Sequence, residues 1–153
     1  MLLMDGIAVA FSELPLDLFA QYELSNQVHE RGGEKEIRFL RQVRNALLPI
    51  RHEGQMRLVA WGCRTGKLPR TGYTWRSTVE AGEWTVYHAV EVEIMATAGL
   101  RNGIWFPIRR GIRGVLAEVG GDQAVYMLVE PSTYYFQIMT RSERMPVLIG
   151  EQI

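Results

Sequence analysis

The sequence predicts an α+β domain with a mostly antiparallel, curled (barrel-like) β-sheet core and two or three helices. Two observations lead to this prediction. After residue 55, the apolar segments are short, rich in β-branched and aromatic residues, and separated by glycine, proline or polar turns. Helical periodicity, by contrast, is concentrated in the first third of the chain. Strands that follow one another with few intervening helices favour antiparallel pairing.

The whole chain, residues 1–153, is expected to form a single domain. It is 47% hydrophobic with 15 glycines and 6 prolines, a composition typical of a globular protein with one core. Its apolar runs are shorter than the roughly 20 residues of a membrane span. The start, "MLLMDGIAVAF", lacks the basic leader of a signal peptide. We therefore expect a cytoplasmic protein without a membrane partner.

The first expected helix lies near the N-terminus. Residues 16–24, "LDLFAQYEL", place Leu16, Phe19 and Ala20 on one helical face. Residues 28–36, "VHERGGEKE", are polar and contain two glycines, which indicates a loop.

A second helix is expected over residues 36–48, "EIRFLRQVRNALL". Its apolar residues recur at helical spacing, and Arg38, Arg41 and Arg44 are three residues apart on a neighbouring face. The pattern therefore predicts an amphipathic helix with a row of arginines, ending near Pro49.

Strands are expected from residue 56 onward. They cover residues 56–62, 84–95, 103–108, 114–119, 124–130, 134–139 and 145–149. The strongest signal is the strict alternation of apolar and polar residues over 84–95. The "RTGKLPRTG" segment after the first strand indicates a basic loop, and Gly120-Gly121-Asp122 is typical of a hairpin turn. Pro146 marks the entry of the last strand, because proline has no N–H to donate within a sheet.

The charge pattern suggests a polyanionic partner. The chain has a formal net charge of zero, yet residues 38–76 hold nine Lys and Arg against one Glu, a net charge of +8. Residues 1–37 have a net charge of −5, and residues 77–100 hold four glutamates and no basic residue. The basic segment is either the footprint of a polyanion or a set of charges that pairs with the acidic N-terminal segment.

Few residues suggest catalysis. Cys63 is the single cysteine, which excludes an internal disulfide, and no Cys/His cluster suggests a metal or cofactor site. A nucleophilic Cys63 would need a base such as His88. A cysteine that ends an apolar strand is more often a small buried hydrophobic residue, and His88 lies on the apolar side of its predicted strand, as a core histidine would. A hydrolase using Cys63 or Ser142 is therefore the weakest of three functional hypotheses.

Several segments resemble one known family. "MTRSERMPVLI" (139–149) resembles the C-terminal signature of the SOS response-associated peptidase (SRAP) family, in which Arg-Met-Pro enters an apolar strand. "RLVAWGC" (57–63) is similar to the family's Trp-Gly strand, and "TWRSTVEAG" (74–82) to its Asn-Ala-Arg segment. "NGIWFPIRRGIRGVL" (102–116) and "LFAQYELS" (18–25) follow in the places of two further family segments.

The resemblance implies a fold and a partner more than a reaction. SRAP proteins bind single-stranded DNA and form a covalent link to abasic sites through an N-terminal cysteine, helped by an asparagine, a glutamate and a histidine. The positions that match these four groups hold Leu16, Thr74, Ser142 and a residue at or near Pro107. The resemblance therefore implies a divergent, phage-related protein with an SRAP-like fold that does not crosslink DNA.

Binding of single-stranded or damaged DNA is the leading hypothesis. Arginines that contact phosphates and aromatic rings that stack on bases form a sequence-tolerant single-strand site. The candidate DNA-binding residues are Arg76, Trp75, Arg144, Arg64, Lys67 and Arg70. The resemblance implies that Arg76 and Arg144 open onto one concave face.

Two alternatives stay open. Trp75 can pack in the core while Arg76 pairs with Glu80 or Glu83, and Trp61 and Trp105 are both expected in the core. The alternative function is a phage-related structural or interaction protein with an inherited SRAP-like fold and no nucleic-acid role.

Overall fold

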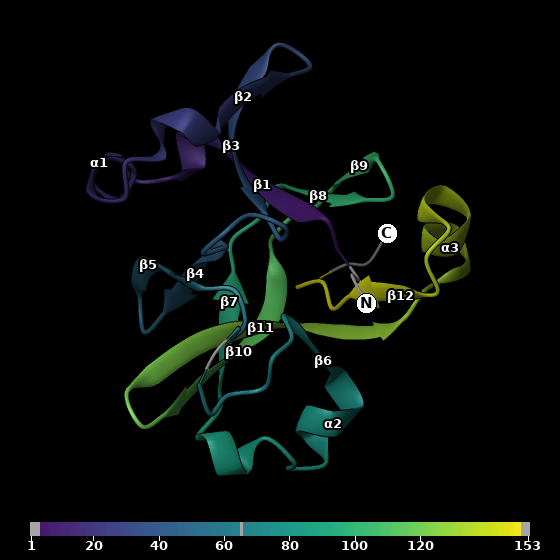
Figure 1. The fold of residues 1–153 in the computed structure, drawn as a ribbon. Helices are drawn as coiled ribbons and strands as arrows, with labels where there is room; N and C mark the ends of the chain where they lie inside the picture. Colours follow the sequence, from purple (N-terminus) through teal and green to yellow (C-terminus); the bar gives the residue numbers. More distant parts are fainter. Residues whose placement is uncertain (1–3, 65, 151–153) are drawn as a thin grey trace.

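The computed structural model describes residues 4–64 and 66–150, and it is an α+β fold built on two mostly antiparallel sheets (Figure 1). The first sheet has five strands, in the order β2 (Val28–Arg31), β3 (Glu34–Leu40), β1 (Gly6–Ala10), β8 (Ala98–Arg101) and β9 (Ile104–Pro107). The second has the order β12 (Arg144–Pro146), β11 (Asp122–Pro131), β10 (Ile112–Val119), β7 (Val90–Ile94), β4 (Leu47–His52) and β5 (Gln55–Ala60), and β6 (Tyr73–Trp75) pairs in parallel with β11.

The α+β class and the predominance of antiparallel strands are confirmed. The described residues form three α-helices, α1 (Leu16–Gln21), α2 (Arg76–Glu80) and α3 (Tyr134–Thr140), and three 3₁₀ turns, η1 (Phe11–Glu13), η2 (Leu24–Gln27) and η3 (Thr85–Tyr87). Neither sheet closes into a ring within this part of the chain, so the barrel-like form stays a prediction. No helix in these residues is long and apolar enough to cross a bilayer.

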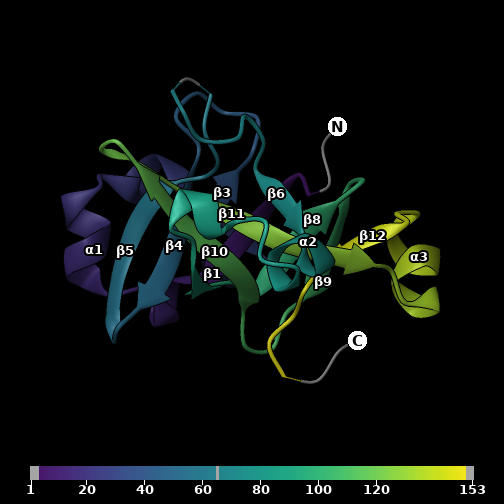
Figure 2. The same ribbon diagram turned by 90° about the horizontal axis from the view of Figure 1, so that it is seen from below.

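The main core lies between the two sheets. Ile7 of β1 and Phe39 of β3 point into it from the first sheet, and Ile50 of β4 and Met127 of β11 point into it from the second. A smaller core surrounds Tyr126 on the opposite side of β11. Figure 2 shows that α1 lies at one end of the molecule, beside β5, and that β12 and α3 lie at the other.

The hairpin predicted around residue 120 is confirmed. Strands β10 and β11 pair from Gly114 with Met127 up to Val119 with Asp122, so Gly120 and Gly121 alone form the turn. Their φ angles of 59° and 88° are the positive values that a two-residue hairpin turn requires.

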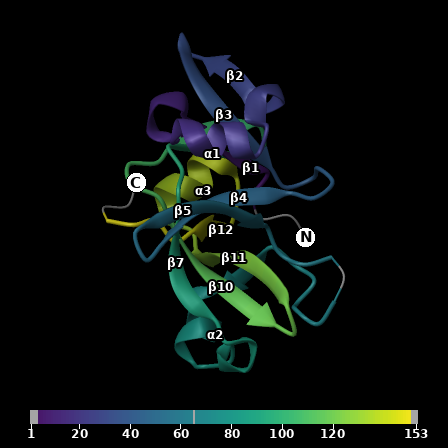
Figure 3. The ribbon, with the colours of Figure 1, turned by 90° about the vertical axis from the view of Figure 1, so that its left-hand side faces the viewer.

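The helix predicted over residues 36–48 is wrong, because this segment ends β3, turns and begins β4. Ile37 and Phe39 are buried while Arg38, between them, is half-buried on the opposite face, which is the period of a strand. The loop predicted over residues 28–36 is instead the β2–β3 hairpin. Figure 3 shows this hairpin standing at the opposite end of the molecule from α2.

Three further segments differ from the prediction. The strand expected over residues 84–95 is reduced to β7, because η3 and a left-handed His88 (φ 53°) precede it. The strand expected over residues 134–139 is α3, whose first turn is capped by the Thr133 side chain accepting from the Phe136 N–H. The last strand covers only β12, and Leu148 adds a single bridge to Ile112.

The N-terminal helix is confirmed in place, but a different face of it is buried. Leu18 of α1 is only 5% exposed, whereas Leu16 is 72% exposed. Phe19 packs against the core and meets Phe11 edge to face, with ring centroids 5.5 Å apart. These contacts hold the short helix against the sheet.

Candidate functional site

A basic hollow of about 560 Å³ opens between the turn after β3 and the loop before β6. Its lining consists of Arg41, Gln42, Arg64, Arg70, Thr71, Gly72 and Tyr73. We call it the arginine pocket. It lies partly in the "RTGKLPRTG" loop, so two of the predicted DNA-binding residues, Arg64 and Arg70, meet there.

The loop that forms one wall of the arginine pocket is fixed to the core at its two ends. The indole N–H of the buried Trp61 donates to the Gly72 carbonyl over 3.0 Å. Gly62 has a φ of 72°, and a Cβ built on it would lie 2.1 Å from the Thr71 carbonyl oxygen. A glycine is therefore required where the two ends of the loop touch.

Two tyrosines hold the floor of the arginine pocket and the middle of the loop. The Tyr73 hydroxyl donates to the Met4 carbonyl over 2.6 Å and accepts from the Met4 N–H over 3.2 Å. The Tyr126 hydroxyl donates to the Pro69 carbonyl over 2.7 Å. Burial, the largest cause, raises the pKa of Tyr126 far above its ordinary value, so this hydroxyl keeps its proton.

Arg64 ties the two walls of the arginine pocket together. Its Nη2 donates to the Arg41 carbonyl over 3.2 Å and to the Val43 carbonyl over 2.9 Å. The turn and the loop, which are distant in sequence, thereby form one surface.

The arginine pocket concentrates positive charge. No acidic residue lines it, and within residues 4–64 and 66–150 none of Arg41, Arg64 and Arg70 forms an ion pair. The Arg41 guanidinium lies over the Trp61 ring at 5.8 Å, and its buried Nε has no hydrogen-bond acceptor. Guanidinium groups without a carboxylate partner are suited to phosphate or carboxylate oxygens.

Trp75, Arg76 and Arg144 come together at the other end of β6. The Arg144 Cζ lies 4.8 Å from the centroid of the Trp75 ring, and Trp75 packs partly against the main core. Arg76 lies 3.2 Å from a Glu130 oxygen and 3.5 Å from a Glu80 oxygen. The alternative considered for Trp75 and Arg76 therefore agrees with these contacts: Trp75 packs partly against the core, and Arg76 pairs with acidic residues.

The family resemblance predicts that Arg76 and Arg144 open onto one concave face, and the structure places both residues beside β11. Arg76 follows β6 and binds β11 through Glu130, and Arg144 pairs with Pro131 of the same strand. Glu130 and Pro131 are neighbours in a strand and alternate in direction, so these contacts do not place both arginines on one face, and the common concave face stays a prediction. Lys67 is not part of either group: it is exposed, with its Nζ 3.9 Å from a Cβ built on Gly120 in the β10–β11 turn.

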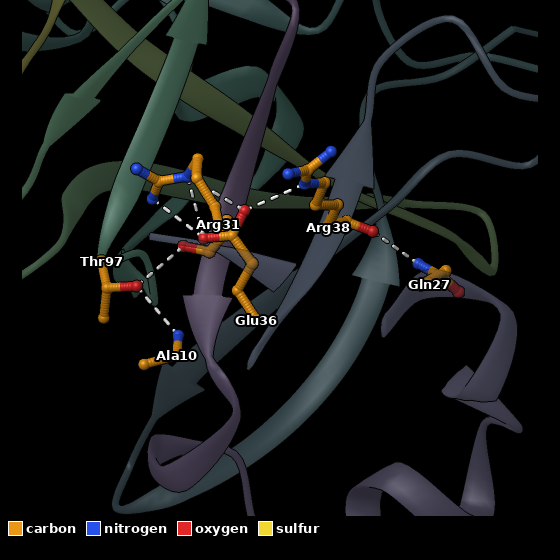
Figure 4. Close-up of polar contacts among 7 residues, drawn as sticks. Ala10, Gln27, Arg31, Glu36, Arg38 and Thr97 are labelled. Atoms are coloured by element: carbon orange, nitrogen blue, oxygen red, sulfur yellow. Dashed lines mark hydrogen bonds and ion pairs between the residues drawn. The ribbon is translucent and has the colours of Figure 1, made fainter. Parts of the chain in front are cut away.

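The basic segment is neutralised only in part by the acidic N-terminal segment. Arg38 donates from Nε to Glu36 over 2.9 Å, and Arg31 binds the same carboxylate (Figure 4). The other ion pairs of the segment use later acids, as between Arg51 and Glu93. The predicted pairing with residues 1–37 is therefore confirmed for Arg38 and is wrong for these others.

The Glu36 carboxylate is charged at neutral pH although its side chain is only 7% exposed. Burial, the largest influence, opposes ionisation, but hydrogen bonds and the charges of Arg31 and Arg38 together hold its pKa below the ordinary value of 4.5. The two guanidinium groups also lie 5.0 and 4.8 Å from the centroid of the Trp105 ring. Trp105 is half-buried under these arginines, so its predicted place in the core is wrong, whereas Trp61 is in the core as predicted.

The residues considered for hydrolysis lie in three different settings. His88 is exposed in η3's left-handed cap, so its predicted role as a core histidine is wrong. The Ser142 hydroxyl is buried and donates to the Arg144 carbonyl over 2.8 Å, which is a turn contact. Cys63 is half-buried and packs against the smaller core.

The position matched to the SRAP cysteine lies apart from the other matched positions. Leu16 begins α1 at one end of the molecule, whereas Ser142 and Arg144 lie at the end that carries α3 and β12 (Figure 2). Thr74 lies in β6, next to Trp75. A nucleophile at residue 16 would therefore be remote from Thr74 and Ser142.

Comparisons with known proteins identify no relative of this chain. No family model matches the chain, and neither the curated proteins nor the solved structures include a match. The function therefore has to be argued from the geometry of the chain itself.

Arg41 lines the arginine pocket but is not among the six residues predicted to bind DNA. It was placed in a helical arginine row with Arg38 and Arg44, whereas the structure places it at the end of β3, in the arginine pocket. The alternation of Glu36, Ile37, Arg38 and Phe39 would have revealed the strand and the turn after it.

Proposed function

We propose that this protein binds single-stranded DNA through the arginine pocket and forms no covalent link to it. The main support is a set of three arginines, Arg41, Arg64 and Arg70, that line the arginine pocket. None of them has an acidic partner among the described residues. In a chain of zero net charge, such a concentration of positive charge calls for an anionic ligand.

A DNA backbone suits this pocket better than a base does. Its lining is mainly arginine, with Gln42, Thr71 and backbone, and the ring of Tyr73 is buried, only 6% exposed. The pocket therefore offers donors for phosphate oxygens and little aromatic surface for stacking. Contacts of this kind position a strand without reading its sequence.

The bound DNA strand can continue from the arginine pocket along β6 toward Trp75 and Arg144. Tyr73 and Trp75 are two residues apart on β6, about 7 Å along the strand. The Arg144 guanidinium lies over the Trp75 ring, so the ring offers a nucleobase little free surface for stacking. The end of β6 at Trp75 therefore contributes a positive charge to the interface rather than an aromatic ring. We include Arg144 in the proposed interface and give Arg76 a lesser part, because Glu80 and Glu130 neutralise it.

The absence of crosslinking follows from the residues at the matched positions. Leu16 has neither a thiol nor a free amine, and Thr74 and Ser142 replace the asparagine and histidine. We therefore propose a divergent SRAP-like protein that has the curled sheet and single-strand groove of the family and does not carry out its crosslinking reaction.

Fluorescence anisotropy with an end-labelled single-stranded 20-mer at low salt tests the proposal. Arg70 is exposed and has no hydrogen bond or ion pair in the described part of the chain, so Arg70→Ala should weaken binding without unfolding the protein. Arg110→Ala is the matched control, because Arg110 is also exposed and its loss changes the net charge equally. Equal effects of the two substitutions would contradict a specific arginine pocket.

One observation favours the alternative, a structural or interaction protein without a DNA role. Residues 131–140 carry no charge, and α3 exposes Tyr134, Tyr135 and Ile138 by 80%, 59% and 64%. Exposed aromatic residues without charge are typical of protein-binding surfaces. A failure of the protein to bind the 20-mer at low salt would put this alternative first.

A further inference from the structure

A second pocket lies on the other side of the turn that borders the arginine pocket. It has a volume of about 330 Å³, within the range of small-ligand pockets. Arg41 and Gln42 line the arginine pocket, and Val43 and Arg44, the next two residues, line this second pocket. Because Cα atoms two residues apart are at most about 7 Å apart, the two pockets share one thin wall.

The second pocket combines apolar surface with amide groups. Leu40 and Val43 are 37% and 44% exposed, and both contribute to its lining. The amide side chains of Asn26, Gln27 and Asn45 line it as well, and no acidic residue does. An apolar face beside groups that both donate and accept hydrogen bonds suits an unpaired nucleobase, which offers a flat ring and a polar edge.

One of the three amide side chains is fixed by a hydrogen bond in the pocket wall. Gln27 donates from Nε2 to the Arg38 carbonyl over 2.9 Å (Figure 4), which fixes its side chain in the pocket wall. Asn45 has a φ of 56°, a left-handed conformation that asparagine tolerates better than most residues. Arg64 holds the turn through the Val43 carbonyl, so the arginine pocket and the second pocket are braced by the same contact.

We propose that the second pocket binds one unpaired nucleobase of the strand whose phosphates lie in the arginine pocket. This inference rests on the proposed function and adds to it a base-binding step. The substrate class is then a single strand that carries bases, rather than any linear polyanion. The wall of residues 41–45 would separate the phosphate from its base, as the two ends of one nucleotide are separated.

Two labelled 20-mers of equal charge test the inference. One has a mixed sequence with all four bases, and the other has a backbone of tetrahydrofuran abasic residues. The native protein should bind the mixed-sequence strand at least about fivefold more tightly, the low end of the range for a base stacked on an aromatic ring, because the exposed apolar residues Leu40 and Val43 are aliphatic. Equal affinity for the two strands, or tighter binding of the abasic strand, would overturn the base pocket and leave phosphate binding intact.

Variants locate the effect. Val43→Ser should weaken binding of the mixed-sequence strand by about threefold and leave the abasic strand unaffected, because it removes apolar surface without changing charge. Val90→Ser is the matched control: Val90 is also 44% exposed, but it lies in β7. Asn26→Ala should behave like Val43→Ser.

The remaining outcomes separate the two proposals. Equal losses for both strands in Val43→Ser would contradict the inference, because the turn would then act only through the arginine pocket. Arg70→Ala should weaken both strands alike. If the native protein binds neither strand at low salt, the proposed function fails and the base pocket fails with it.

Discussion

Replacing Glu36 by glutamine removes the charge on which Arg31 and Arg38 converge. The carboxylate accepts from Arg31 Nη2 and from Arg38 Nε, each over 2.9 Å, and both guanidinium groups lie against the Trp105 ring. The three side chains link β2 and β3 to Trp105 of β9, although β1 and β8 lie between β3 and β9 in the sheet. Glutamine keeps the shape of the side chain but replaces one acceptor oxygen by an amide donor, so the substitution removes the charge and one of the two acceptors.

The magnitude follows from exposure. A hydrogen bond to a charged group contributes about 1.5–3 kcal/mol when it is well buried. The Arg38 side chain is 22% exposed, and its bond lies near the low end of that range. The Arg31 side chain is 40% exposed, so solvent reduces its share to about 0.5 kcal/mol. Glu36→Gln should therefore lower the free energy of unfolding by about 2 kcal/mol.

Urea unfolding measures the loss, and its pH dependence identifies the cause. A loss of about 2 kcal/mol moves the urea midpoint down by about 1 M at neutral pH. The pKa of Glu36 is lower in the folded protein than its ordinary value of 4.5. The stabilisation is therefore fully present above about pH 4.5 and is lost as the pH falls through the folded-state pKa.

The control is Glu34→Gln, in the same strand. Glu34 is exposed and has no ion pair among the described residues, so its replacement should change the midpoint little. An unchanged midpoint for Glu36→Gln at pH 7 would refute the reasoning, as would a difference from the native protein that stays constant down to pH 3.

Three other predictions concern the pocket loop, Trp75 and the chemistry. Gly62→Ala should cost more than about 2 kcal/mol in urea unfolding, because its Cβ would meet the Thr71 carbonyl at 2.1 Å. Gly54→Ala, with a similar φ of 76° and nothing within 4 Å, should cost only about 1 kcal/mol, and equal losses would contradict the steric argument. Trp75→Ala should destabilise the protein by about 2 kcal/mol through lost packing and the lost Arg144 contact, whereas a stability change within 0.5 kcal/mol would make Trp75 a free surface ring. Incubation with abasic single-stranded DNA should give no heat-stable adduct on a denaturing gel; a shifted band would contradict this, and its loss in Cys63→Ala would locate the nucleophile.

The sequence predicted the parts of the fold that local chemistry decides. Gly120-Gly121 forms a hairpin turn because both residues adopt a positive φ, and the neighbouring strands carry alternating or continuous apolar residues. The prediction was wrong where the same residues fit both the period of a helix and the period of a strand. Residues 36–48 have apolar residues at helical spacing, yet burying Ile37 and Phe39 together requires a strand.

The opposite error occurs at α3, where residues 134–139 were predicted to form a strand and form a helix because its first turn is capped. Tyr134, Tyr135 and Phe136 are aromatic residues that favour strands, but Thr133 caps the first turn, and of these three aromatic residues Phe136 alone is buried. Strand β11 has already ended at Pro131, so this segment pairs with no strand among the described residues, and Phe136 and Thr140 attach the helix to the core. The exposed tyrosines of α3 were therefore not predictable from β propensity.

The site was predicted in part. Arg64 and Arg70 were identified from the basic loop, and the structure brings them together with Arg41. Arg41 could not be placed beside them from sequence, because the pairing of β1 with β3 and the bonds of Arg64 decide where the turn lies. Ion pairs also depend on the sheet order, which is why Arg76 proves to be neutralised by the distant Glu130.

The salt dependence of single-strand binding tests the central claim most directly. Each phosphate contact on a single strand contributes a slope of about −0.7 to the logarithm of affinity against the logarithm of salt. Contacts from Arg41, Arg64, Arg70 and Arg144 therefore predict a slope of about −3 for a labelled 20-mer, of which about −2 comes from the arginine pocket. The slope should be reduced by about 0.7 in Arg70→Ala and unchanged in Arg110→Ala. A slope near zero, or a slope that Arg110→Ala reduces and Arg70→Ala does not, would contradict DNA binding through the arginine pocket.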